Sequence, residues 1–563
     1  MINLEIMKSF LKRIFYFVLI LSLNFTCKKN SVNNPSPSGT FKLVTLNIDD
    51  SIYTNTTINN IDKDPNIQLG FSAPLDQASA QSEVIMSQGS NIISLNYSFG
   101  NHDSLLIVQP KSPLSSTTSY TLTIFSGLKS QSDSTLKKNI IINLSTSLDT
   151  TDKFPRISDS ALLDLVEQQT FKYFWDFGHP VSGLARERNS SGDVVTIGGS
   201  GFGVMAILAG ISRNFISRPQ GLNRISQIVS FLTTSAQRYH GAFPHWLNGS
   251  TGATIPFSSE DDGADLVETS YLMEGLLCAR QYFNSGSDST EINLRAAINQ
   301  LWNGIEWSWF RQNGQNVLYW HWSPDFGFAI NMQINGWNEA MIVYALAASS
   351  NTDTIPKIVY DNGWAGKGNM KNGNSYYGIP LPLGPNLGGP LFFAHYSFLG
   401  INPSNLQDAY ANYWTQNTNH TQINFSYCVA NPKSFVGYSS SCWGLTASDD
   451  NNGYLAHAPD NDDGVISPTA AISSLPYTPT RSMDALRFFY YKLGDKIWGQ
   501  YGFMDAFNLT TIWFSNSWLA IDQGPEIIMI ENFRTGLIWN LFMSCPEIKR
   551  GMKDLGFQSP NLQ

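Results

Sequence analysis

Three acidic residues follow one another at helical spacing in the segment 257–271. Asp261, Asp265 and Glu268 are spaced i, i+4 and i+7, and the segment contains no Lys or Arg. On one helix they would share a face, where like charges destabilise the helix. The helix dipole favours an acid in the first turn, which accounts for Asp261 but not for Glu268. We therefore predict a catalytic or sugar-binding acidic face. A calcium site is the alternative, although EF-hand spacing is absent.

A fourth acid, Glu339, begins an almost wholly apolar stretch beside Trp337. Burial favours the protonated carboxyl, which is the form that a general acid needs near neutral pH. Two carboxyl groups that flank a glycosidic bond are the minimal apparatus for its hydrolysis. The pattern predicts that Glu339 protonates the leaving oxygen and that the acidic face supplies the base. The alternative is a surface Glu placed favourably at a helix N-terminus.

Aromatic and polar side chains gather in three segments, 241–248, 389–396 and 442–450. Aromatic faces stack on sugar rings, and His side chains bond to sugar hydroxyls. Each of these residues has core packing as its alternative role. The candidates are Trp246, Trp337, Trp443, His245 and His395.

The composition favours a neutral, polyhydroxylated ligand. Charged residues make up 14% of the chain, aromatic residues 13%, and the net charge is −9. No basic stripe exists to bind a phosphate backbone, so nucleic acid is excluded as a partner. The high aromatic content argues against intrinsic disorder. No zinc-ligand spacing appears, and we predict neither a metal nor a cofactor.

Two regimes of hydrophobic spacing predict two domains. Residues 40–150 alternate apolar and polar positions in short runs, which indicates an Ig-like β-sandwich acting as a spacer or packing module. Residues 156–563 show helical periodicity, starting with a helix capped by Ser158 or Asp159. At two helices per repeat this length accommodates about twelve helices, so we expect an all-α (α/α)6 barrel. An α-solenoid is the alternative.

The N-terminus is predicted to be an export signal. Residues 1–26 combine a basic start with a short apolar run, as in a signal peptide. Cys27 follows as a candidate lipidation site, with residues 27–39 as a tether, which would anchor the protein in the periplasm or outer membrane. An ordinary cleaved signal is the alternative. In an exported chain Cys428 and Cys442 could form a disulfide.

Seven segments in order along the helical part resemble the glycoamylase-like domain family, which includes glycoside hydrolase family 144, the bacterial endo-β-1,2-glucanases. The segments are 183–188, 198–206, 261–269, 336–339, 389–393, 443–449 and 530–537. The resemblance covers roughly residues 157–557.

The resemblance implies an (α/α)6 barrel that hydrolyses β-1,2-glucan with inversion. The family's essential acids would fall on Asp261, Asp265, Glu268 and Glu339, while the loops of Arg186 and Asp449 would line the sugar groove. We expect an endo-acting monomeric enzyme. An exo-acting or oligosaccharide-specific enzyme of the same fold is the first alternative. A non-catalytic glycan-binding lipoprotein is the second.

Overall fold

The computed structural model describes residues 40–563, which form two compact units. The predicted signal peptide, the tether and Cys27 lie outside the described residues. No helix within residues 40–563 is long and apolar enough to cross a membrane. The first unit holds the described residues up to Ile58, Asp64–Pro113 and Tyr120–Asn143; the second holds Asn59–Lys63, Leu114–Ser119 and Leu144–Gln563.

The N-terminal unit is a β-sandwich, as predicted. Two five-stranded sheets have the strand orders β2-β1-β4-β8-β7 and β3-β10-β9-β5-β6. In β4, Ile67, Leu69 and Phe71 are buried while the residues between them are less so, because neighbouring side chains on a strand point to opposite faces. The strands are β1 Leu43–Ile48, β2 Ser51–Tyr53, β3 Thr57–Ile61, β4 Ile67–Phe71, β5 Val84–Gln88, β6 Asn91–Ile93, β7 Leu95–Gly100, β8 Leu105–Pro110, β9 Ser119–Ile124 and β10 Ile140–Thr146, with one helix, α1 Gln77–Glu83.

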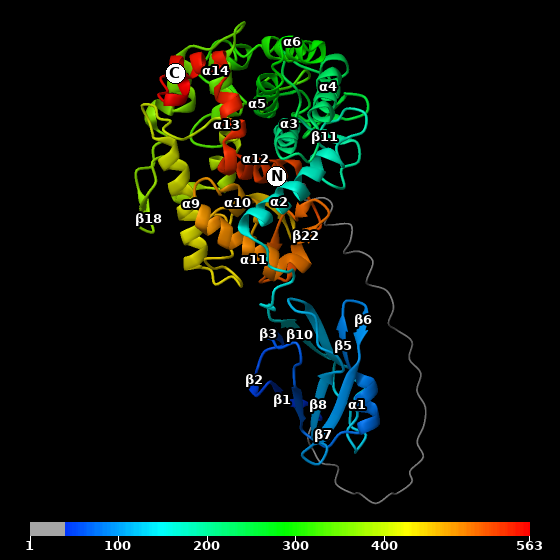
Figure 1. The fold of residues 1–563 in the computed structure, drawn as a ribbon. Helices are drawn as coiled ribbons and strands as arrows, with labels where there is room; N and C mark the ends of the chain where they lie inside the picture. The colour runs from blue at the N-terminus through cyan, green and yellow to red at the C-terminus, as the bar shows by residue number, and fades with distance from the viewer. Residues whose placement is uncertain (1–39) are drawn as a thin grey trace, which may run out of the picture. The chain divides into compact units, whose positions relative to one another are not determined.

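The second unit is predominantly helical, again as predicted. Its first helix is capped by the side chain of Ser158, which accepts a hydrogen bond from the Ala161 N–H. Figure 1 shows α3 and α5 inside the unit, with α4, α6 and α14 towards its outside. The helices are α2 Asp159–Trp175, α3 Ile197–Ser212, α4 Arg218–Thr234, α5 Leu266–Tyr282, α6 Ser289–Asn303, α7 Met341–Ser349, α8 Lys357–Val359, α9 Tyr413–Ala430, α10 Pro468–Ser473, α11 Pro479–Ile497, α12 Ala520–Thr535, α13 Leu537–Met543 and α14 Pro546–Leu555.

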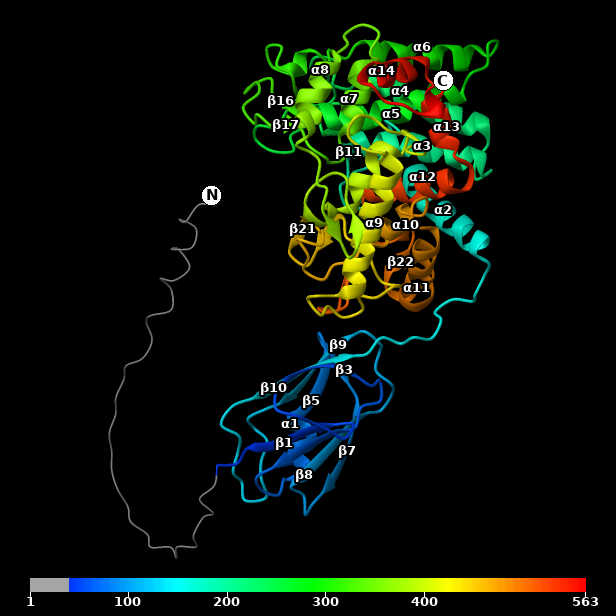
Figure 2. The ribbon, with the colours of Figure 1, turned by 90° about the vertical axis from the view of Figure 1, so that its left-hand side faces the viewer.

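Helix α3 lies at the centre of this unit and packs against both α5 and α12 (Figures 1 and 2). Glycines allow α3 and α5 to approach closely. A Cβ on Gly201 would lie 2.1 Å from the Tyr271 carbonyl oxygen, and one on Gly275 would lie 2.2 Å from the Gly201 carbonyl oxygen. Helix α7 packs against α5, and α10 packs against α12. The inner helices therefore neighbour one another in the order α7, α5, α3, α12, α10.

The three acids do not share one helix face, as the spacing had suggested. Helix α5 begins at Leu266, so Asp261 lies in the loop before it and Asp265 is its N-cap. Near the C-terminus, Gly536 adopts φ 69° and ends α12, so α12 and α13 are separate helices.

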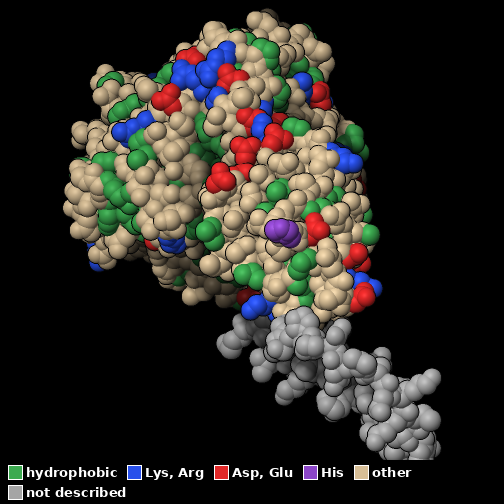
Figure 3. Space-filling view, turned by 90° about the horizontal axis from the view of Figure 1, so that it is seen from below, with side chains coloured by type: hydrophobic (Ala, Val, Ile, Leu, Met, Phe, Trp, Pro, Cys, Tyr) green, Lys and Arg blue, Asp and Glu red, His purple; other side chains and the backbone are tan. Residues whose placement is uncertain are grey.

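The surface matches the low charge of the sequence. In Figure 3, uncharged polar side chains and backbone cover most of the visible face, and charged groups are few. The predicted Cys428–Cys442 disulfide is not formed in the structure. Both residues are free buried thiols, as are Cys278 and Cys545.

Candidate active site

The acidic segment before α5 forms the core of the site. Asp265 caps the helix, with its Oδ1 accepting hydrogen bonds from the backbone N–H groups of Val267 and Glu268, both at 2.9 Å. Strand β14 (Ala264–Asp265) pairs with β16 (His321–Trp322), and the register sets Asp265 opposite His321. The cap therefore positions one acid, and the strand pair brings in a histidine that has no local sequence relation to it.

Two histidines contact these carboxylates. His245 Nδ1 lies 2.9 Å from Asp265 Oδ2, and His321 Nε2 lies 3.4 Å from Asp261 Oδ2. Burial by itself would lower the pKa of His245, but the charge of Glu268 and the contact with Asp265 raise this pKa to about 9. His245 is therefore an imidazolium at neutral pH. Burial lowers the pKa of His321, which favours its neutral form.

Burial would also raise the pKa of Asp265, but the hydrogen bond with His245, together with the nearby His321 and the charge of His245, holds it below its ordinary value. Asp261 behaves in the opposite way, since burial and the charge of Asp265 raise its pKa to about 7. Its Oδ1 is buried without a hydrogen-bond partner. Both oxygens of the Asp265 carboxylate are therefore hydrogen-bonded, whereas Asp261 has one oxygen without a partner and a pKa of about 7.

Glu268 lies against the N-terminus of α3. Its Oε2 accepts a hydrogen bond of 2.7 Å from the Gly198 N–H and one of 3.4 Å from Thr196 Oγ1. Burial nevertheless raises the pKa of Glu268. A Cβ on Gly198 would lie 2.6 Å from this same oxygen, so glycine is required there by the close approach of the carboxylate.

Glu339 enters from a different element, two residues before α7. Its carbonyl oxygen accepts hydrogen bonds from Tyr271 Oη, at 3.3 Å, and from Ser397 Oγ, and these hold the backbone in place. Burial, with added repulsion from Glu268 and Asp265, raises the pKa of the Glu339 carboxyl to about 7. The Glu339 carboxyl therefore lies near enough to Glu268 and Asp265 to be affected by their charges.

A second carboxylate cluster joins the predicted Asp449 to Asp505 and Asp522, two acids that sequence reasoning missed. Arg188 donates to Asp449 at 3.0 Å, and the Asp449 N–H donates to Asp505 Oδ2 at 2.7 Å. Burial and the neighbouring acids raise the pKa of Asp505 to about 7 and that of Asp522 well above its ordinary value. Asp522 lies in the first turn of α12, close before the apolar run 527–530, and an acid that precedes an apolar run is the signal that selected Glu339.

The predicted sugar-binding residues divide into those that can reach a ligand and those that cannot. His245 and Trp246 are half-buried, and both pack against the exposed ring of Phe257. Asp449 is half-buried within the second cluster. Arg186 stacks on Phe177, with its Cζ 4.6 Å from the ring centroid, and Arg188 is the arginine that contacts Asp449.

Three of the predicted sugar contacts are core residues instead. Trp443 is fully buried and meets Phe425 edge-on. Trp337 is 5% exposed and packs on Phe398 and Tyr413, which leaves no face for a sugar. His395 is 2% exposed, with its Nε2 bonded to Ser474 Oγ, and burial lowers its pKa to about 3. Lone aromatic and His side chains cannot be separated into core and site by spacing, because both environments select the same residue types.

One group within residues 40–563 has the geometry of a cation site. Ligand atoms of His245, Asp261 and Asp265 lie within 4.8 Å of one another. Within this group His245 Nδ1 lies 2.9 Å from Asp265 Oδ2, the distance of a charge-assisted hydrogen bond. The group is an ion-paired acid cluster.

Comparison with known proteins agrees with this geometry. The family model described as "Putative glucoamylase" matches residues 331–546, and that of the bacterial Ig-like domain matches residues 43–147. A solved structure described as a "putative glucoamylase" from Bacteroides uniformis is 57% identical, with a TM-score of 0.72, and covers 73% of this chain and 100% of its own. The endo-β-1,2-glucanase from Chitinophaga pinensis, in complex with sophorotriose and glucose, is 53% identical, with a TM-score of 0.71. The match covers 72% of this chain and 100% of the glucanase chain.

A curated relative from Parabacteroides distasonis is an exo β-1,2-glucooligosaccharide sophorohydrolase acting at the non-reducing end. It is 46% identical over 421 residues, and the match spans 71% of this chain but 58% of the relative's length. Paired carboxyls at the N-termini of packed helices, together with these relatives, define a helical glycoside hydrolase. The chain belongs to the glycoamylase-like family, and it carries an additional N-terminal bacterial Ig-like domain.

Proposed function

We propose that the protein hydrolyses β-1,2-glucan with inversion of the anomeric centre. The observation that carries the proposal is Glu339, whose pKa is raised to about 7 beside the acidic face of Glu268 and Asp265. A carboxyl that keeps its proton near neutral pH can donate it to the leaving glycosidic oxygen. The linkage is inferred from the glucanase and sophorohydrolase relatives.

Within the acidic face, Asp261 is the best candidate for the base. Its Oδ1 has no hydrogen-bond partner and so keeps an unused acceptor position, whereas both oxygens of Asp265 are already hydrogen-bonded. Asp265 and His245 hold this arrangement in place. The Asp505–Asp522 pair is the other source of a base. Comparing Asp261→Asn with Asp522→Asn decides between them, because only loss of the base abolishes turnover while substrate binding persists.

We further propose that cleavage is endo-acting. The 53% identity to the endo-β-1,2-glucanase, over all of that chain, supports this mode. The sophorohydrolase relative favours the alternative, an exo-acting enzyme on oligosaccharides. Linear β-1,2-glucan should yield a ladder of short oligosaccharides before any single product dominates, with inverted anomers by NMR. Release of one product from chain ends would favour the exo mode, and binding without cleavage of any β-1,2-glucan would favour a glycan-capture protein.

The ring of inner helices supports closure as an (α/α)6 barrel. The order α7, α5, α3, α12, α10 leaves a gap between its two ends, and the 3₁₀ segments Leu391–Ala394 and Tyr396–Phe398 pack against α9 and α7 respectively. We propose that these segments complete the barrel.

We also propose that the protein is an exported monomer, anchored through a lipid on Cys27 in the periplasm or outer membrane. The support is the apolar run followed by a cysteine in the sequence. Cys27→Ser should move the protein from the membrane to the soluble fraction, and a mature N-terminus beyond Cys27 would refute the anchor.

A further inference from the structure

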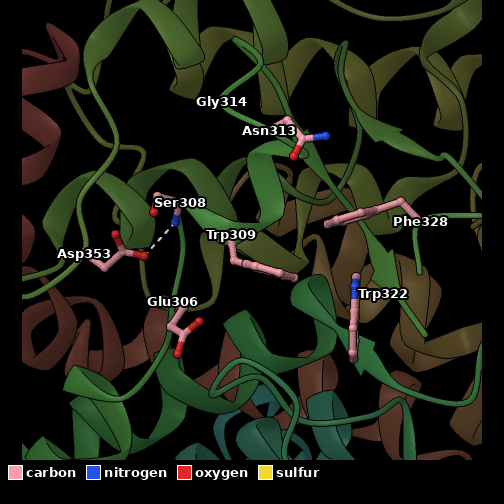
Figure 4. Close-up of a pocket in the computed structure, with 8 residues that line it drawn as sticks. All are labelled: Glu306, Ser308, Trp309, Asn313, Gly314, Trp322, Phe328 and Asp353. Atoms are coloured by element: carbon pink, nitrogen blue, oxygen red, sulfur yellow. Dashed lines mark hydrogen bonds between the residues drawn. The ribbon is translucent and has the colours of Figure 1, made fainter. Parts of the chain in front are cut away.

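A cavity of about 620 Å³ is lined in part by strand β16 and contains none of the four acids of the proposed chemistry. It is lined by Glu306, Ser308, Trp309, Asn313, Gly314, Trp322, Phe328 and Asp353. This volume is within the range of roughly 300–1,000 Å³ that is typical of small-molecule sites. Figure 4 shows the rings of Trp309, Trp322 and Phe328 around one space, with Asn313 above it.

The aromatic rings are held in fixed positions. Trp309 stacks on His240 with a centroid distance of 3.7 Å, and His240 Nδ1 lies 2.9 Å from Glu306 Oε2. Trp322 crosses Trp309 at 75° and meets His240 edge-on. Trp309 is nevertheless 41% exposed, because His240 covers only one of its faces. A rigid aromatic platform that is open to solvent on one side binds a flat apolar ring face at little entropic cost.

The polar groups at the cavity suit a neutral ligand with hydroxyl groups. The eight lining residues, among those that the structure describes, include two carboxylates and one amide but no Lys or Arg. Asn313 is carried on a turn with φ 67°, which Arg311 fixes by donating to the Gly314 and Gln315 carbonyl oxygens at 2.8 Å. Carboxylate and amide oxygens accept hydrogen bonds from hydroxyls, and the absence of cations disfavours an anion.

The cavity faces away from the catalytic acids. His321 and Trp322 are consecutive residues of β16, and His321 approaches Asp261 and Asp265. Side chains of consecutive strand residues point to opposite faces, so Trp322 lines the cavity on the other side of the strand. The residues that line the cavity include none of the four acids of the candidate site. The cavity is therefore distinct from the acid cluster.

We propose that this cavity is a second carbohydrate-binding site, which stacks a glucosyl residue of a neutral β-linked gluco-oligosaccharide on Trp309 and bonds its hydroxyls through Asn313 and Glu306. The choice of glucan as ligand rests on the proposed function. Such a site would hold the polymer near the groove without entering the bond-breaking step.

The test is native electrophoresis in gels containing linear β-1,2-glucan, on the Glu339→Gln background so that the glucan is not cut. Trp309→Ala should weaken retention by about five- to tenfold, the loss expected for one aromatic stacking contact. Trp309→Phe, which keeps a ring, should retain most of the binding. Phe533→Ala removes a side chain that is also 41% exposed, on α12, and serves as the matched control.

Equal retention of Trp309→Ala and Phe533→Ala, or no retention of the Glu339→Gln parent, would overturn the second site. In the active enzyme, Trp309→Ala should raise KM for the polymer more than KM for a β-1,2-linked tetrasaccharide. An equal rise in both would place the cavity in the catalytic groove instead. Failure of the proposed function is distinguishable, because it is read from cleavage of β-1,2-glucan by the wild-type protein.

Discussion

Replacing Glu339 by Gln keeps the size and polarity of the side chain but removes the proton that it donates. General acid catalysis contributes about 10²–10⁴-fold to rate, so kcat on β-1,2-glucan should fall by at least that factor. Binding should be retained, because the amide can still accept and donate hydrogen bonds.

The same substitution has a predictable effect on stability. The pKa of Glu339 rises from an ordinary value of 4.5 to about 7 on folding. A carboxyl with a raised folded-state pKa costs nothing below the unfolded value and destabilises the fold increasingly as pH rises through the folded value. The upper limit, from 1.36 kcal/mol per pKa unit, is about 3 kcal/mol above pH 7, and partial exposure of the side chain to water reduces it.

Glu339→Gln should therefore match the wild type in melting temperature near pH 4.5 and exceed it at pH 8. The assay pairs thermal melts across pH 4.5–8 with reducing-sugar release from β-1,2-glucan. Glu339 and Asp261 both have a pKa of about 7, so wild-type activity should be highest near this pH. Above it activity should fall as Glu339 loses its proton, and below it as Asp261 gains one. Near-normal turnover by the variant, or a melting-temperature difference that does not change with pH, would refute the assignment of Glu339 as a buried general acid.

Four further substitutions test the surrounding site. His245→Gln removes the imidazolium that lowers the pKa of Asp261, so the acidic limb of the pH–activity profile should move to higher pH; an unmoved limb would contradict the coupling. Gly198→Ala should reduce activity by displacing Glu268, although Ala is the better helix former by about 1 kcal/mol; full activity with a raised melting temperature would show that Glu268 is not needed in this position. Asp265→Ala should lower the free energy of unfolding by about 0.5–2 kcal/mol through loss of the helix cap, whereas Asp261→Asn should leave stability unchanged or raise it. Thermal melts measure both effects, and equal losses of stability would contradict the difference in their hydrogen bonding.

Much of the site could be predicted from local sequence. Asp261, Asp265 and Glu268 are close in the chain, and Glu339 precedes an apolar helix, so spacing and composition were sufficient to select them. The reason offered for the first three was only partly right. They converge because a loop, an N-cap and the first turn of α5 follow one another, not because they share one helix face.

The partners of these acids depended on tertiary structure. His321 reaches Asp261 through the pairing of β14 with β16, and Asp505 reaches Asp449 and Asp522 across segments far apart in the chain. No local sequence pattern predicts such contacts, because side chains distant in sequence meet only when the helices pack. For the same reason, the sequence could not show that Trp246 is half-buried beside His245 whereas Trp443 is fully buried.

The sequence by itself determined the two-domain organisation and four acids of the site, since hydrophobic period and local charge spacing are properties of short segments. Only the tertiary structure decided which carboxyl has both oxygens hydrogen-bonded, which has an oxygen without a partner and which holds a proton near neutral pH. These properties arise from burial and from charges brought together by packing, and neither exists in the unfolded chain.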